Sequence, residues 1–290
     1  MIARPLTEGL LETGRLAVHH IHAPHPDAAA PRVLFLGGSN FDLTLKRSFL
    51  NSDLAHGFTF ATYEPRGIGR TEHPDGSWDI QDYAKDALAV MDALEWDTAA
   101  IVGESFGGMT ALHLAGLAPD RISALVVASA TAGGPVHRSF DISSFLSLSR
   151  RDAAIEALCL QDTRNIAQQT QDPDGFAQKL AARVQFEEDF AQPSIASGGY
   201  ARLLNARRGH DCTSDLPYIE TPTCVLAGRF DQQARPEAQQ ALADALPQGQ
   251  FHLFDAGHGV LFATPRATET AAAFIRTQWA NRAAKRKALM

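Results

Sequence analysis

A serine stands among glycines at the point where a predicted strand gives way to a predicted helix. The run Gly103-Glu104-Ser105-Phe106-Gly107 follows apolar residues 99–102 and precedes a helical pattern that begins near Met109. Gly103 and Gly107 avoid steric conflict in a sharp turn, because glycine has no Cβ atom. Such a turn holds a serine in a strained conformation with its hydroxyl projecting, and the helix N-terminus behind it favours a developing negative charge. The pattern therefore predicts that Ser105 is a nucleophile.

A general base and an acid are expected to serve this nucleophile. A serine hydroxyl needs a base within hydrogen-bond reach, and histidine titrates near neutrality. His258 lies in a glycine-flanked turn after the apolar run 250–254, and Asp231 follows the run 223–227. A carboxylate there would fix the histidine tautomer, and in a parallel sheet the strand ends meet at one edge. Asp255, in the same turn as His258, is a rival for the acid, and Asp231 could instead cap the next helix.

Strand and helix patterns alternate along most of the chain. Short apolar runs rich in β-branched or aromatic residues predict strands at 15–21, 32–36, 59–63, 99–102, 124–128, 223–227 and 250–254. Periodic apolar residues predict helices at 82–94, 109–118, 236–246 and 267–279. This alternation predicts an α/β fold with a mostly parallel sheet and helices on both of its faces.

The alternation stops between residues 131 and 218, where the chain becomes helical and polar. Helices are predicted at 140–149, 151–161, 175–190 and 194–208. We therefore expect a core of residues 1–130 and 219–290, with a helical cap of residues 131–218 inserted in it. Some of the cap's apolar side chains should pack between its own helices, and the rest should face Ser105 across a cleft. These side chains are Phe140, Phe145, Leu146, Leu148, Phe176, Phe186 and Phe190.

From about residue 14 to residue 279 the chain resembles the α/β-hydrolase family. The resemblance rests on the strand–turn–helix context of Ser105 and on the order of Ser105, Asp231 and His258 along the chain. It favours Asp231 over Asp255 as the acid, because the family's acid follows a late strand. It implies the α/β-hydrolase fold with a helical cap and a serine nucleophile of the esterase or lactonase type.

An oxyanion hole needs two hydrogen-bond donors close to the nucleophile. By the same resemblance, one donor is the backbone N–H of Phe106. The second comes from the loop after strand 32–36, which reads Gly37-Gly38-Ser39-Asn40 where many relatives carry a His-Gly pair. We expect Ser39 to be this donor, with Asn40 as the alternative. Gly37, Gly38, Asn40 and Glu104 are expected to lie at the substrate pocket, since glycines let a backbone approach a ligand closely.

Composition argues against several classes of protein. The formal net charge of −7 leaves no basic footprint for nucleic acid or an anionic membrane. The three cysteines form neither a disulfide framework nor a zinc motif, and no stretch suits a signal peptide or a membrane span. The histidines at 19, 20, 22 and 25 lie on a predicted edge strand and its turn without carboxylate or cysteine neighbours, which argues against metal. We expect a cytoplasmic monomer or homodimer that needs no metal or cofactor and acts on a small molecule.

Together these features predict hydrolysis of a carboxylic ester or lactone of a small to medium, fairly apolar molecule through an acyl-enzyme on Ser105. The strand-to-helix turn that carries Ser105 is called the elbow below. A serine at this position argues against family members that open halides or epoxides with a carboxylate. The glycine loop and the segment Arg66-Gly67-Ile68-Gly69 also resemble those of bacterial methylesterases and enol-lactonases. Carbon–carbon bond hydrolases and acyltransferases use the same three residues, and some relatives keep them as small-molecule receptors. These functions are the alternatives.

Overall fold

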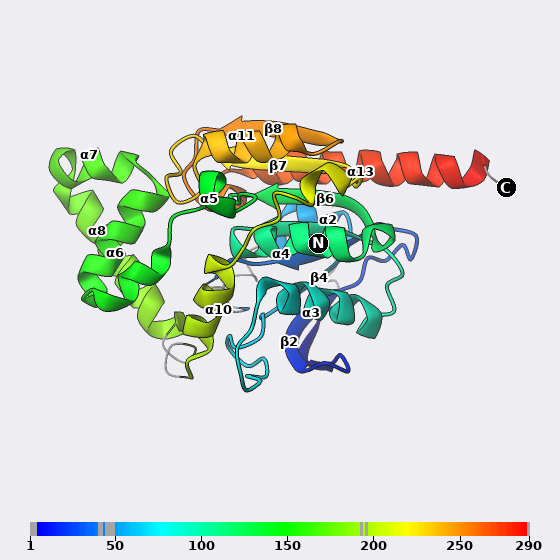
Figure 1. Cartoon of the computed structure of the whole chain (residues 1–290), viewed down its shortest axis with the longest axis horizontal. Coiled ribbons are helices and arrows are strands. Elements are labelled where there is room, and N and C mark those ends of the chain that lie inside the picture. Colours follow the sequence, from blue (N-terminus) through cyan, green and yellow to red (C-terminus); the bar gives the residue numbers. More distant parts are fainter. Residues whose placement is uncertain (1–4, 40–42, 44–49, 192–193, 195–196, 289–290) are drawn as a thin grey trace.

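The computed structural model describes residues 5–39, 43, 50–191, 194 and 197–288 (Figure 1). Within these residues, strands form one sheet in the order β1-β2-β4-β3-β5-β6-β7-β8. β1 pairs with β2 and β2 with β4 in antiparallel register, and the other neighbouring pairs are parallel. The predicted mostly parallel sheet is confirmed. The strands are β1 (Thr7–Glu12), β2 (Ala17–Ala23), β3 (Arg32–Leu36), β4 (Thr59–Tyr63), β5 (Ala99–Glu104), β6 (Ile122–Ala128), β7 (Thr223–Gly228) and β8 (Gly249–Phe254).

Helices cover both faces of this sheet (Figure 1). β5, β6 and β7 are buried along their whole length, as expected for strands covered on both sides. One face of the sheet carries α3 (Ile80–Ala93), α4 (Phe106–Leu117) and α11 (Pro236–Ala245), and the other carries α2 (Asp53–His56), α12 (Val260–Ala263) and α13 (Pro265–Ala288). Among the helices that the structure describes, none is long and apolar enough to cross a membrane.

The edge of the sheet lies one strand earlier in the chain than predicted. β1 is the edge strand, and it escapes the prediction because its sequence mixes Thr, Glu and Gly with only two leucines. β2, predicted as the edge, lies between β1 and β4. His19 and His20 are therefore buried, and His20 Nδ1 lies 2.9 Å from the carbonyl oxygen of Gly9. Among the described residues, no group of three His, Cys, Asp or Glu side chains is placed to hold a metal ion.

Residues 131–218, which lie between β6 and β7, are called the insertion below. It forms a series of helices that extends beyond the end of the sheet (Figure 1). These are α5 (Gly134–His137), η3 (Ile142–Ser147), α6 (Arg150–Gln161), α7 (Arg164–Gln171), α8 (Pro173–Phe186), η4 (Glu187–Ala191), α10 (Gly199–Arg208) and η5 (Leu216–Tyr218).

Local chemistry explains where the insertion departs from the predicted helices. The helix predicted at 140–149 is present but shorter, as the 3-10 helix η3. The Ser143 and Ser144 hydroxyls donate to the side chain and the carbonyl of Asp141, and such local bonds compete with an α-helix. α7 was not predicted because its sequence, RNIAQQTQ, has no apolar run to reveal it. α10 begins at Gly199 rather than at residue 194.

Candidate active site

Ser105 forms a tight turn between β5 and α4. Its φ of 54° and ψ of −117° lie outside the regions that residues with a side chain prefer. A Cβ atom on Gly103 would collide with the carbonyl of Gly107, and one on Gly107 would collide with the carbonyl of Leu36. The Ser105 N–H donates to the carbonyl oxygen of Ala128 at 2.8 Å, which ties the turn to β6. The surrounding backbone therefore imposes the strained conformation of this serine.

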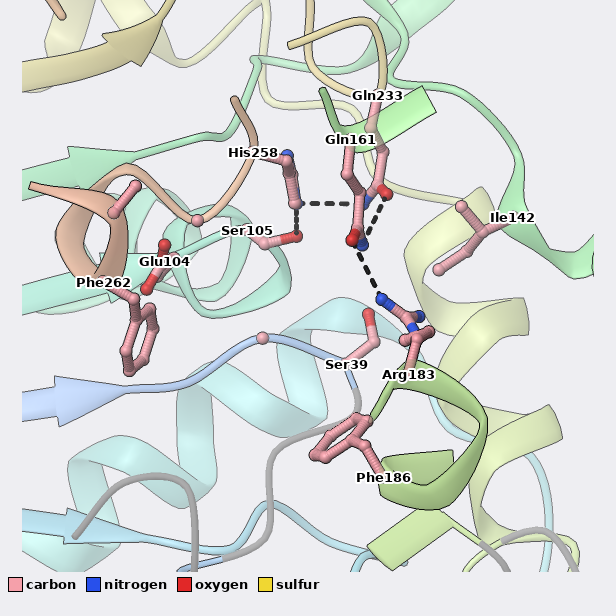
Figure 2. Close-up of a pocket in the computed structure, with 13 residues that line it drawn as sticks. Ser39, Glu104, Ser105, Ile142, Gln161, Arg183, Phe186, Gln233, His258 and Phe262 are labelled. Carbon is pink, nitrogen blue, oxygen red and sulfur yellow. Dashed lines mark hydrogen bonds between the residues drawn. The ribbon is translucent and has the colours of Figure 1, made fainter. Parts of the chain in front are cut away.

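Ser105, His258 and Asp231 form one line of hydrogen bonds, of which Figure 2 shows the first. His258 Nε2 lies 2.9 Å from Ser105 Oγ, and His258 Nδ1 lies 2.8 Å from Asp231 Oδ2. Asp231 is fully buried, and its other oxygen accepts from the backbone N–H groups of Gln233 and Ala234, both at 2.8 Å. These bonds orient the carboxylate toward Nδ1, so Nε2 is left to face the serine.

The rival acid lies outside this line. Asp255 has a side chain that is 79% exposed, and its Oδ1 accepts from Arg229 Nε at 2.8 Å. Asp231 does not cap the next helix either, since the N-cap position of α11 is Arg235. The structure thus brings together Ser105, His258 and Asp231, the three residues that the resemblance selects.

The turn that carries His258 is held by two residues that the sequence did not suggest. The carbonyl oxygen of Gln161, at the end of α6, accepts from the His258 N–H at 2.6 Å. Ser129 Oγ accepts from the N–H groups of Gly259 and Val260 at 3.2 and 3.3 Å. Ser129 directly follows β6, so its place at a strand end was a usable signal. Gln161 offered none, because the position of the insertion cannot be inferred from local patterns.

Two backbone N–H groups lie beside the elbow, those of Phe106 and Ser39. Neither the Phe106 N–H, the first in α4, nor the Ser39 N–H donates to any residue within the described ranges. Gly38 and Ser39 line the same cavity as the nucleophile. Gly37 lies beneath the elbow, where it lines a small cavity together with Phe106. Asn40, the alternative donor, lies outside the described residues.

A cavity of about 460 Å³ opens beside Ser105, between the end of the sheet and the insertion (Figure 2). The insertion contributes Ile142, Gln161, Arg183 and Phe186 to its wall. Its polar members, Gln161 and Arg183, were not predicted, since polar residues on helices are usually solvated.

The other apolar side chains singled out in the insertion lie elsewhere or are not described. Phe140, Leu146 and Leu148 are 44%, 51% and 42% exposed. Phe145 packs on Phe140, with their ring centres 5.7 Å apart. Phe176 is buried against Leu180 and Ala154 within the insertion, and the Phe190 side chain lies outside the described part. The apolar side chains that were singled out in the sequence and that the structure describes are therefore divided between packing within the insertion, solvent and the cavity.

Glu104 lines the cavity as a buried acid. It is 1% exposed, and neither carboxyl oxygen has a hydrogen-bond partner among the described residues. Burial raises its pKa well above the usual value, the charge of Asp231 raises it further, and the nearby Leu261 N–H offsets part of this. The fold thus favours the neutral, protonated form of Glu104 more than water does.

A parallel sheet whose strand ends carry a serine elbow, a histidine and a buried aspartate defines a class of hydrolase-like folds, and known proteins agree. A family model described as the alpha/beta hydrolase fold matches residues 31–265. The chain belongs to the α/β-hydrolase fold family, as the sequence predicted.

Individual relatives are more distant. The chain is 28% identical over 244 residues to a candidate carbamate hydrolase of Variovorax paradoxus strain S110, covering 82% of this chain and 87% of that protein. It is 27% identical over 207 residues to 3-oxoadipate enol-lactonase 1 of Acinetobacter baylyi, covering 69% and 72%. The solved enol-lactonase of Burkholderia xenovorans LB400 matches with a TM-score of 0.70 and 23% identity, covering 93% of this chain and 97% of that one. That last likeness concerns the fold.

Proposed function

We propose that this protein is a serine hydrolase that cleaves a carboxylic ester or lactone of a small to medium, fairly apolar molecule. The observation that carries the proposal is the unbroken line of hydrogen bonds from buried Asp231 through His258 to the strained Ser105. Relatives named as a carbamate hydrolase and an enol-lactonase support attack at a carbonyl carbon.

The proposed chemistry follows from the roles of these groups. His258 Nε2 takes the proton of Ser105 as its Oγ attacks the carbonyl carbon, and Asp231 stabilises the imidazolium that results. The negative charge on the former carbonyl oxygen is bound by the N–H groups of Phe106 and Ser39. The tetrahedral intermediate then expels the alcohol oxygen, which receives the proton from His258. Water, activated by the same histidine, hydrolyses the acyl-enzyme and restores the serine.

We further propose that residues 131–218 act as a cap over a core of residues 1–130 and 219–290. Ile142 and Phe186 supply apolar surface to the cavity, while Ser105 and His258 come from the sheet side. Such a wall favours an apolar group on the substrate, because most binding energy in small-molecule pockets comes from apolar contact. The cavity volume of about 460 Å³ is in the range of pockets for small ligands.

A panel of p-nitrophenyl esters, lactones, thioesters and amides tests this function. The proposal predicts many turnovers on esters or lactones and slower turnover of amides. A receptor that retains the three residues would release at most one equivalent of product per protein and then stall. Preferential acyl transfer to an added alcohol or thiol would favour an acyltransferase, and cleavage of a 1,3-diketone with inert esters would favour a carbon–carbon bond hydrolase.

A further inference from the structure

A chain of side-chain hydrogen bonds leads from the insertion to the imidazole of His258 (Figure 2). Arg183 Nη1 donates to Gln161 Oε1 at 2.9 Å, and Gln161 Nε2 lies 3.4 Å from Gln233 Oε1. Gln233 Nε2 then lies 3.0 Å from His258 Nε2. Gln233 is 4% exposed and lines the cavity, so this contact is shielded from bulk water.

The guanidinium fixes the direction of every bond in this chain. Arginine can only donate, so the Gln161 atom that faces it must be the carbonyl Oε1. The amide nitrogen of Gln161 is then directed at Gln233, which must present its own carbonyl oxygen. This leaves an N–H of Gln233 pointing at His258 Nε2, which must be the unprotonated nitrogen of the ring.

Arg183 is well suited to anchor the chain. Its Nε donates to Glu187 Oε1 at 2.6 Å, and its guanidinium carbon lies 5.9 Å from the centre of the Phe186 ring. Its side chain is 16% exposed. An arginine held in this way by a carboxylate and an aromatic ring loses little further freedom when it orients Gln161.

One lone pair on His258 Nε2 therefore meets two donors, the Ser105 hydroxyl at 2.9 Å and the Gln233 amide at 3.0 Å. When Nε2 takes a proton, the Gln233 N–H faces another N–H that carries positive charge. We propose that Gln233 is a positioning residue that restrains the base: it competes with Ser105 for Nε2 and disfavours the imidazolium. Arg183 and Gln161 hold it in this orientation. The inference rests on the proposed function, because it assigns His258 as the base.

The proposal gives the insertion a direct influence on the rate. If Arg183 or Gln161 moves away, the amide of Gln233 is free to rotate and can present its oxygen to Nε2. The Gln233 oxygen would then accept a hydrogen bond from the protonated Nε2 and stabilise the imidazolium, whereas the Gln233 N–H group disfavours it. Reactivity of Ser105 would then depend on the state of a side chain that lies in α8.

Rates of labelling by a small fluorophosphonate at pH 8 test the proposal without relying on a particular substrate. Gln233→Leu, which keeps the size and removes the donor, should label about two- to tenfold faster than the wild type, the range of one neutral hydrogen bond. Gln161→Leu should accelerate labelling by a smaller factor, because it only frees Gln233 to rotate. Gln232→Leu, the same change at the exposed neighbouring residue, should label at the wild-type rate.

The pH profile separates this role from a merely structural one. Removing the donor makes protonation of the base easier, so the acid limb of labelling should move to higher pH in Gln233→Leu. Gln233→Glu, which offers a carboxylate to the imidazolium, should move it further. The other charged or acidic groups around the site, Asp231, Glu104, Arg183 and Arg207, are common to all these variants.

Labelling of folded Gln233→Leu and Gln161→Leu at or below the wild-type rate at pH 8 would overturn the proposal, as would an unmoved acid limb. Thermal melts identify any variant that does not fold, and Gln161→Leu tests the chain from the insertion side if Gln233→Leu fails. If the wild type itself is not labelled at Ser105, the proposed function fails. If the wild type is labelled while both variants are not accelerated, this inference alone fails.

Discussion

The serine elbow and the insertion meet at one cavity, yet they are stabilised in different ways. The elbow rests on β5 and β6, which are buried along their whole length, and Gly107 packs directly on the backbone of Leu36. Within the insertion, α6 and α8 form only a small core around Phe176 and Leu180, whereas Tyr200, Leu203 and Leu204 of α10 pack into the main core beside the sheet. The end of α6 is tied to the turn after β7 by backbone hydrogen bonds, in which the Thr163 N–H donates to the carbonyl oxygen of Phe230 and the Gln232 N–H donates to that of Leu160, both at 3.0 Å.

This difference separates two kinds of contribution to the site. The position of Ser105 is set by the sheet and should tolerate changes in the insertion. The turns that carry Asp231 and His258 are held from both sides, since Ser129 supports the histidine turn from β6 and Gln161 supports it from α6. Changes at the elbow should thus act on the chemistry, and loss of apolar surface from the insertion's wall should act on binding. Arg183 and Gln161 differ from the apolar wall, because they reach the base through Gln233.

Ser105→Ala gives the largest expected effect. Without the nucleophile, ester hydrolysis should fall by at least about a thousandfold, leaving what the oxyanion donors and binding contribute. Ser147→Ala, an exposed serine of the insertion, should retain full activity. Comparable kcat/KM values for the two variants would remove Ser105 from the chemistry.

The two candidate acids should differ sharply. Asp231→Asn removes the buried partner of His258 Nδ1 and should lower kcat by about a hundred- to ten-thousandfold while the fold survives. Asp255→Asn breaks an exposed pair with Arg229 and should change kcat by less than about twofold. Steady-state kinetics on both variants decide the matter, and a reversed order of effects would assign the acid to Asp255.

Loss of the apolar ring of Phe186 from the wall of the cavity should affect mainly binding. Phe186→Ser removes apolar contact worth about 1.5–3 kcal/mol and should raise KM for longer acyl esters by about tenfold or more. Labelling of Ser105 by a small fluorophosphonate should stay within about twofold of the wild type. Phe140→Ser, which alters an exposed ring of the same insertion, is the matched control. Equal KM values for wild type and Phe186→Ser across a chain-length series would contradict the role of the insertion as a cap.

The smallest effect concerns stability and its pH dependence at Glu104. Burial raises the pKa of this carboxyl in the folded chain, so folding is favoured below the ordinary value of 4.5 and loses stability as the pH rises above it. The stability of Glu104→Gln relative to the wild type should therefore rise over a series from pH 5 to 8. Urea unfolding measures this, with the exposed Glu156→Gln as control. A constant difference across this range would mean that Glu104 is already ionised in the fold.

The sheet and the elbow were predictable from local patterns, whereas the walls of the site were not. Apolar runs marked the buried strands, and strand ends pointed to Ser105, Asp231 and His258. β1 was missed because an edge strand can be polar. Gln161, Gln233 and Arg183 have ordinary polar surroundings in the sequence, and their convergence depends on how the insertion lies against the end of the sheet (Figure 1).

Identifying the atom that becomes acylated tests the central claim most directly. A slowly hydrolysed p-nitrophenyl ester, quenched in acid before turnover is complete, should leave one acyl group on the protein, and peptide mass mapping should locate it on Ser105. The adduct should be absent from Ser105→Ala. Product release without any adduct, or an acyl group on a different residue, would contradict a mechanism in which Ser105 attacks the carbonyl carbon.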